Sequence, residues 1–153
     1  MTYSSLRAGK TLCVISGNSL SNMKMQKILY LAHMFHLGLD EDNPKPLIKE
    51  KFQAWEFGPV EPTLYHYVKS FGSKNIPAAA FYLNKSIPAD TTEYAMLAET
   101  YKKLENKTAI ELVRITHWSE GAWADVYEEG IRNNEIPTDK ILKELNARKT
   151  TKQ

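Results

Sequence analysis

The sequence predicts a mainly α-helical fold: a single compact helical domain of about six to seven helices, with a short β-like element around residues 47–57. Apolar residues recur at three- and four-residue spacing through most of the chain, which is typical of amphipathic helices. Serine, threonine, proline and glycine stand where these stretches begin and end. With 153 residues, of which 42% are hydrophobic and 25% charged, the chain has the composition of one globular domain with one core.

Two helices are expected before the first prolines. One covers about residues 5–16, with its left-handed stop at Gly17. The other begins after Ser21, a favourable N-cap, and runs to Gly38. Its inward-facing residues are expected to be Met25, Ile28, Leu29, Ala32 and Phe35. This apolar stripe makes the second helix the expected centre of the core.

The middle of the chain is punctuated by prolines. Pro44 and Pro46 favour an extended turn, because the residue before a proline is pushed out of the α region. The aromatic-rich stretch at residues 47–57 lacks helix caps and is expected to form short β-like segments. Pro62 suits the first turn of a following helix. Residues 73–89 are expected to form an irregular surface connection.

Three further helices are expected to complete the fold. Asp90 with Glu93 marks the start of one, and Thr108 opens a capping box at the start of the next. A short helical stretch carries Trp123, and a last helix follows Pro137. Together with the earlier elements, these helices account for the whole predicted fold.

We expect one domain over residues 1–153, with a core at about residues 5–146 and a basic C-terminal tail at residues 147–153.

The distribution of charge bears on the class of partner. The net charge of +2, from 20 basic and 18 acidic residues, is too balanced for an electrostatic nucleic-acid binder. Basic residues gather near the C-terminus at Lys140, Lys143, Arg148, Lys149 and Lys152. Because the helix dipole favours cations there, we expect a solvated helix end.

The cellular setting is also predicted from simple patterns. The longest apolar stretch, residues 28–39, is too short to cross a bilayer, and we expect neither a membrane segment nor a secretory signal. Cys13 is the only cysteine, so no internal disulfide can form. We therefore expect a cytoplasmic protein in which Cys13 is a small buried filler.

No catalytic, cofactor or metal site is predicted. His33 and His36 share one helix face, but two ligands do not make a zinc site, and we expect ordinary surface or cap-forming histidines. No nucleophile turn or glycine-rich phosphate loop appears in the sequence. We therefore expect a protein that is not an enzyme and needs no cofactor.

The Gly58-Pro59 turn and its aromatic neighbours are the most distinctive feature. In one interpretation, Trp55 and Phe57 pack under the turn, and glycine supplies backbone angles that a close corner requires. In the other, the aromatics and the turn form a rigid recognition edge. We favour the structural role for Trp55, Gly58 and Pro59. The partner-binding candidates are nearby residues, of which the first three are expected to be exposed: Glu56, Glu61, Tyr65 and Lys69.

Three motifs carry a family resemblance. Residues 24–30, Lys-Met-Gln-Lys-Ile-Leu-Tyr, resemble the Lys-Leu-Gln-Lys-Leu-Leu-Tyr helix of the phage-associated Panacea domain. Residues 54–62 resemble its Ala-Trp-x-x-Gly-Pro-Val-x-Pro block, and residues 112–117 with Trp123 resemble its Leu-x-x-x-Thr-His and Pro-Trp segment. Ala122 replaces the family's proline. The motif residues are Lys24, Gln26, Lys27, Tyr30, Trp55, Gly58, Pro59, Pro62, Thr116, His117 and Trp123.

The resemblance implies an antitoxin that binds and neutralises a cognate toxin protein by direct contact. Because the family meets several unrelated toxin classes, the shared motif is expected to maintain the fold while the varying surface selects the partner. One alternative is an adaptor that delivers the bound toxin to a protease. Another is a DNA-binding autorepressor, although the chain leaves no room for a separate basic helix-turn-helix module. An enzyme acting on the toxin or its product is the last alternative.

Overall fold

The computed structural model describes residues 1–151, which form seven α-helices and one two-stranded antiparallel sheet. The helices are α1 (Ser5–Ser16), α2 (Asn22–Leu37), α3 (Pro62–Val68), α4 (Thr92–Leu104), α5 (Ala109–Thr116), α6 (Ala122–Val126) and α7 (Thr138–Thr151). The strands are β1 (Gln53–Trp55) and β2 (Gly58–Val60). The predicted fold class, a mainly helical single domain with a short β element, is confirmed.

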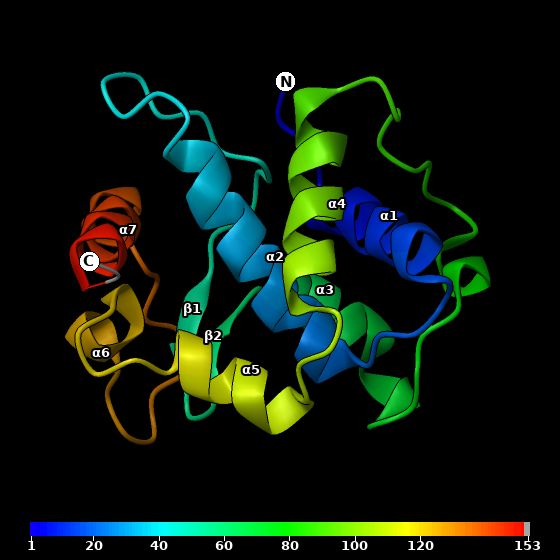
Figure 1. Cartoon of the computed structure of the whole chain (residues 1–153). Coiled ribbons are helices and arrows are strands. Elements are labelled where there is room, and N and C mark those ends of the chain that lie inside the picture. Colours follow the sequence, from blue (N-terminus) through cyan, green and yellow to red (C-terminus); the bar gives the residue numbers. More distant parts are fainter. Residues whose placement is uncertain (152–153) are drawn as a thin grey trace.

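Helix α2 is the centre of the domain. It passes through the middle of the molecule and packs against α1, α4, α5 and α7 and against strand β2 (Figure 1). Met25, Ile28, Leu29 and Ala32 are buried as expected, and Phe35 is partly buried. The helix is also buried on its polar positions, because neighbours cover nearly its whole circumference. Its central role is confirmed.

Side-chain caps set most of the helix starts. Ser21 accepts the backbone N–H of Lys24 at the start of α2, and Thr108 forms the expected capping box on α5. Gly17 ends α1 with a φ of 64°, in the left-handed region. The start of α4 differs from the prediction by one residue. The Thr91 hydroxyl accepts the backbone N–H of Tyr94, so Thr91 is the N-cap of α4 and Asp90 lies outside the helix.

The β element lies later than predicted. Trp55 pairs with Gly58 across a tight two-residue turn, so the hairpin ends at Val60 and not before the glycine. Only the last part of residues 47–57 belongs to it, while Ile48 makes an isolated parallel bridge to Tyr3. The aromatic stretch could not form a hairpin without a second strand, and Gly58-Pro59-Val60 supplies that strand.

The connection at residues 73–89 is more ordered than predicted. It contains the 3₁₀ helix η2 (Ala78–Phe81), and it buries Ile76, Phe81 and Ile87 in the main core. The Phe81 ring stacks on Tyr67 with the two centroids 5.2 Å apart. The segment covers α1 and α3, and the burial of its apolar side chains stabilises this position because their surface is removed from water.

Helix α7 continues through most of the expected basic tail and ends at Thr151, and Lys152 lies outside the described residues. Arg148 is only partly solvated, since it forms an ion pair with the buried Glu144. Lys149 is exposed, as expected for a solvated helix end. None of the helices in the described part of the chain is both long and apolar enough to cross a membrane.

Candidate functional site

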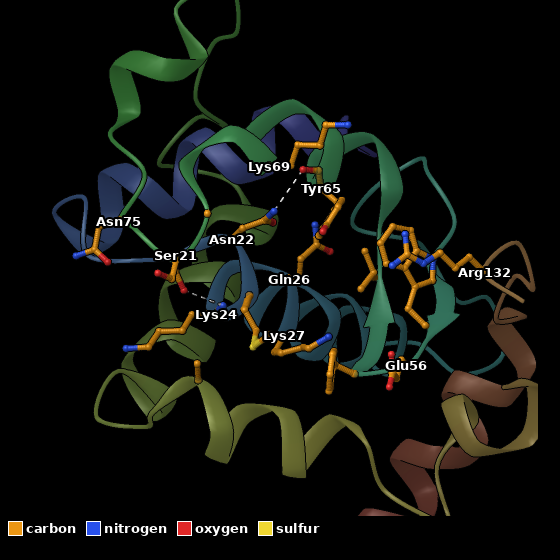
Figure 2. Close-up of a pocket in the computed structure, with 17 residues that line it drawn as sticks. Ser21, Asn22, Lys24, Gln26, Lys27, Glu56, Tyr65, Lys69, Asn75 and Arg132 are labelled. Atoms are coloured by element: carbon orange, nitrogen blue, oxygen red, sulfur yellow. Dashed lines mark hydrogen bonds between the residues drawn. The ribbon is translucent and has the colours of Figure 1, made fainter. Parts of the chain in front are cut away.

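A cleft of about 610 Å³ opens beside the hairpin tip, where the turn consists of Glu56 and Phe57 and the predicted Gly58-Pro59 turn is instead the start of strand β2 (Figure 2). Its walls come from the first half of α2, the hairpin, helix α3, the 3₁₀ helix η1 (Lys69–Phe71) with the residues after it, the start of α5, and Arg132. Segments far apart in the sequence therefore meet around one concavity. Its volume lies in the range of about 300–1,000 Å³ that is typical of ligand-binding sites.

Lys27 lies at the floor of the cleft with only 2% of its surface exposed. Its ammonium group donates a hydrogen bond to the carbonyl oxygen of Pro59 at 3.0 Å. Burial lowers the pKa of Lys27 to about 7, because a charged amine loses its hydration there. At neutral pH this amine therefore has an unusual balance of charged and neutral forms.

Gly58 is required at this floor for two reasons. Its φ of 109° is one that L side chains rarely adopt. A Cβ atom at this position would also lie 3.2 Å from both the Lys27 amine and the Thr116 hydroxyl. The Thr116 hydroxyl donates to the carbonyl of Leu112 within α5. The glycine thus allows the hairpin to approach α2 and α5 closely.

Gln26 and Glu61 join α2 to the entrance of α3. The Gln26 amide accepts the Glu61 backbone N–H at 2.7 Å and donates to the Glu61 carbonyl at 3.2 Å. The Glu61 carboxylate accepts the backbone N–H groups of Thr63 and Leu64 at 2.8 and 2.9 Å. Glu61 is 1% exposed, so its predicted place among the exposed partner-binding residues is wrong. The helix that begins at Pro62 needs an N-cap, and Glu61 folds back to supply it.

The other motif residues of the hairpin region also form internal contacts. Trp55 is 7% exposed, and its carbonyl oxygen accepts the indole N–H of Trp123 at 2.6 Å. The ring of His117 lies against Trp123 with the ring planes tilted by 36°, and it donates a hydrogen bond to the carbonyl of Glu56 at 3.0 Å. Phe57, by contrast, is 57% exposed, so the prediction that it packs under the turn is wrong. In a two-residue turn between antiparallel strands, the tip residue has no neighbouring strand to cover it.

A buried carboxylate that the sequence reading missed connects three helices. Glu144 accepts hydrogen bonds from the Tyr30 hydroxyl at 2.8 Å, the Ala122 backbone N–H at 2.9 Å and Arg148 at 2.8 Å. Its side chain is fully buried. The available signal was its position three residues after Ile141, on the apolar face of α7. Charged residues are seldom fully buried unless paired, and two of the three partners, Tyr30 and Ala122, come from other parts of the chain.

The two helical histidines are buried, so the expected surface or cap-forming role is wrong for both. His36 contacts the carboxylate of Glu93 at 2.8 Å and the carbonyl oxygen of Lys45 at 2.6 Å. Burial, followed by the nearby charges of His36 and Lys51, lowers the pKa of His33 to about 3. No group of three or more potential ligands is placed to hold a metal ion within residues 1–151.

The rim of the cleft combines apolar and cationic side chains. Met23 at the start of α2 is 40% exposed and Phe57 at the hairpin tip is 57% exposed, and both line the cleft. The guanidinium of Arg132 lies 4.5 Å above the Trp55 ring, and Tyr65 meets the same ring edge-on with centroids 4.8 Å apart. The predicted candidates that line the cleft are Glu56, Tyr65 and Lys69, with the motif residues Lys24, Gln26, Lys27 and Trp55.

Arg132 and Met23 were not predicted as binding residues. Arg132 is far from the hairpin in sequence, and no local pattern places it over Trp55. Met23 stands beside the apolar stripe of α2 in the sequence, so the pattern did not distinguish it from a core residue. The arrangement suits recognition, because aromatic side chains, hydrogen-bond donors and several cations line the same opening.

Comparisons with known proteins relate the chain to a family of antitoxins. The family model described as "Antitoxin SocA-like, Panacea domain" matches residues 25–124. Antitoxin SocA of Caulobacter vibrioides (strain NA1000 / CB15N) is 32% identical over 123 residues. The alignment covers 75% of this chain and 63% of that protein, so the chain spans less than two thirds of the relative's length. No solved structure matches the chain significantly.

Proposed function

The chain belongs to the family of SocA-like antitoxins with a Panacea domain, which confirms the resemblance carried by its motifs, and we propose that it binds and neutralises a cognate toxin protein by direct contact. The proposal rests on one observation: the motif residues form internal contacts, while other side chains beside them are exposed at the cleft. Motif residues such as Gln26, Trp55 and Trp123 are engaged in internal hydrogen bonds. Next to them, exposed apolar and cationic side chains surround an open cleft.

This proposal assigns no catalytic step to the chain. Burial raises the pKa of Cys13 to about 12, which opposes formation of the reactive thiolate. Lys27 has a lowered pKa, but its amine is hydrogen-bonded to the Pro59 carbonyl and serves the contact between α2 and the hairpin. Binding is therefore the activity that these groups support, and the proposal needs no cofactor.

The test is co-expression of the domain with the product of the neighbouring gene, which is the candidate toxin. We expect restored growth, an undiminished toxin level and a stoichiometric complex after purification. Such a complex should bury on the order of 1,200–2,000 Å². Rescue by a domain that never contacts the toxin contradicts the proposal.

The adaptor hypothesis differs in the fate of the toxin. An adaptor for proteolysis would restore growth while the toxin disappears, and deletion of the host proteases would then abolish the rescue. Neutralisation by contact predicts rescue in the same deletion strains. Toxin levels followed by immunoblot in both backgrounds therefore separate the two mechanisms.

A further inference from the structure

The cleft has a strong excess of positive charge. Lys24, Lys27, Lys69 and Arg132 line it, and Glu56 is the single acidic residue among its lining residues. In Figure 2, Lys69, Arg132 and Lys24 lie on three sides of the opening, with Lys27 between them. The whole chain carries a net charge of only +2, so this local excess is not a general property of the surface.

The three cations at the rim, Lys24, Lys69 and Arg132, are free to meet a partner, whereas Lys27 is buried. The ion pairs found within residues 1–151 include none of Lys24, Lys69 and Arg132. Arg132 rests on the Trp55 ring, which orients its guanidinium without neutralising it. The Lys27 amine has a carbonyl partner but no carboxylate. A carboxylate brought to the cleft would therefore meet cations that no carboxylate within residues 1–151 neutralises, and one of them, Arg132, is already oriented by Trp55.

The same cleft also offers apolar surface. Met23 and Phe57 line it as exposed side chains, and Val60 and Trp55 line it as buried ones. Exposed apolar side chains gathered beside a concavity are typical of protein interaction sites. Cations placed around such a surface favour a partner segment with the complementary composition.

We propose that this cleft binds a segment of the toxin in which an apolar side chain is flanked by carboxylates. The inference rests on the proposed function and names the chemistry of the contact. The apolar side chain packs against Met23 and Phe57, and the carboxylates pair with Lys24, Lys69 and Arg132 at the rim. Lys27 holds the floor in place through Pro59. A nucleic-acid ligand fits less well, because Glu56 interrupts the cationic surface and the whole chain carries a net charge of only +2.

The first test is isothermal titration calorimetry of the full chain with the purified product of the neighbouring gene. The variant Lys24→Glu/Lys69→Glu/Arg132→Glu reverses the charge of the three cations at the rim. The control Lys45→Glu/Lys49→Glu/Lys85→Glu makes the same change in net charge at exposed lysines that do not line the cleft. We expect the rim variant to bind at least about 100-fold more weakly and the control to stay within about threefold of the parent.

A rim variant that binds like the parent, or a control that weakens binding equally, overturns the inference and leaves the proposed function intact. A parent chain that does not bind the toxin defeats both. If the rim variant melts below the assay temperature, Lys24→Gln/Lys69→Gln/Arg132→Gln replaces it, with an expected loss of about tenfold. Equal binding by that neutral variant also overturns the inference.

The second test identifies the partner's groups. A carbodiimide joins amines to carboxylates only where they are in contact, and mass spectrometry locates the resulting amides. We expect Lys24 and Lys69 to be joined to aspartates or glutamates that flank an apolar residue of the toxin. Cross-links confined to Lys45, Lys49 and Lys85, or displacement of the toxin by duplex DNA, would point to another surface or to phosphate recognition and overturn the inference.

Discussion

Trp55 and Phe57 stand two positions apart in the same hairpin, yet one is buried and the other exposed. The buried ring contacts Tyr65 and supports Arg132, and its backbone carbonyl binds Trp123. The exposed ring lies at the turn tip on the cleft rim. The difference teaches that the motif and the proposed interaction surface are interleaved, since positions only two residues apart in one motif differ in whether they support the fold or face the cleft.

The contrast between the two rings is tested most directly by replacing each of them with alanine in turn. Trp55→Ala should lower the free energy of unfolding by ~3–5 kcal/mol, because it removes a large buried side chain and leaves a cavity. Phe57→Ala should change it by less than about 0.5 kcal/mol and weaken toxin binding instead. Urea denaturation and calorimetry measure the two quantities. Equal destabilisation by both variants would contradict the assignment.

The buried carboxylate network around Glu144 extends the comparison to residues that do not line the cleft. Glu144→Gln keeps the shape of the side chain but removes its charge beside Arg148. We expect a loss of ~2–3 kcal/mol, since a charge-assisted pair is broken and the hydrogen bond from Tyr30 is weakened. Lys149→Gln, an exposed change on the same helix, is the control. An unchanged denaturation midpoint for Glu144→Gln would show that the network does not stabilise the fold.

Lys27 allows the comparison to be tested by pH. Its pKa is lowered to about 7 in the folded chain and stays near 10.5 in the unfolded chain. The unfolded state therefore binds more protons between these values, and stability rises with pH in this window and is lost as pH falls to 7. Between pH 7 and 9 the parent should gain about 2 kcal/mol relative to Lys27→Met. The difference between the two chains removes contributions from other groups.

Chemical denaturation of both proteins at pH 6, 7, 8 and 9 measures this effect. Below pH 7 the two curves should run parallel, because Lys27 is then protonated in both states. Curves that stay parallel up to pH 9 would show that the amine keeps its ordinary affinity for protons in the folded chain.

Local signals in the sequence were enough to predict most of the fold. Ser21, Gly17 and Thr108 act on their own neighbours in the chain, so their caps could be predicted without knowing the tertiary structure. Glu144 and Arg132 could not be placed in this way, because their roles depend on Tyr30 and Trp55, which only the tertiary structure brings near. The cleft is predictable only in part for the same reason.

Glu61 and Glu56 provide the smallest and most specific test, since both were predicted as partner-binding acids but the structure separates them. Glu61→Ala should cost about 1 kcal/mol of stability, because the first N–H groups of α3 lose the carboxylate that caps them. Glu56→Ala should leave stability unchanged, since this side chain is exposed. It should also tighten toxin binding modestly, because it removes the one acid from a cationic cleft. Urea midpoints at constant slope and calorimetric affinities measure both effects. If Glu61→Ala keeps full stability and loses the toxin, its carboxylate contacts the partner and does not cap the helix.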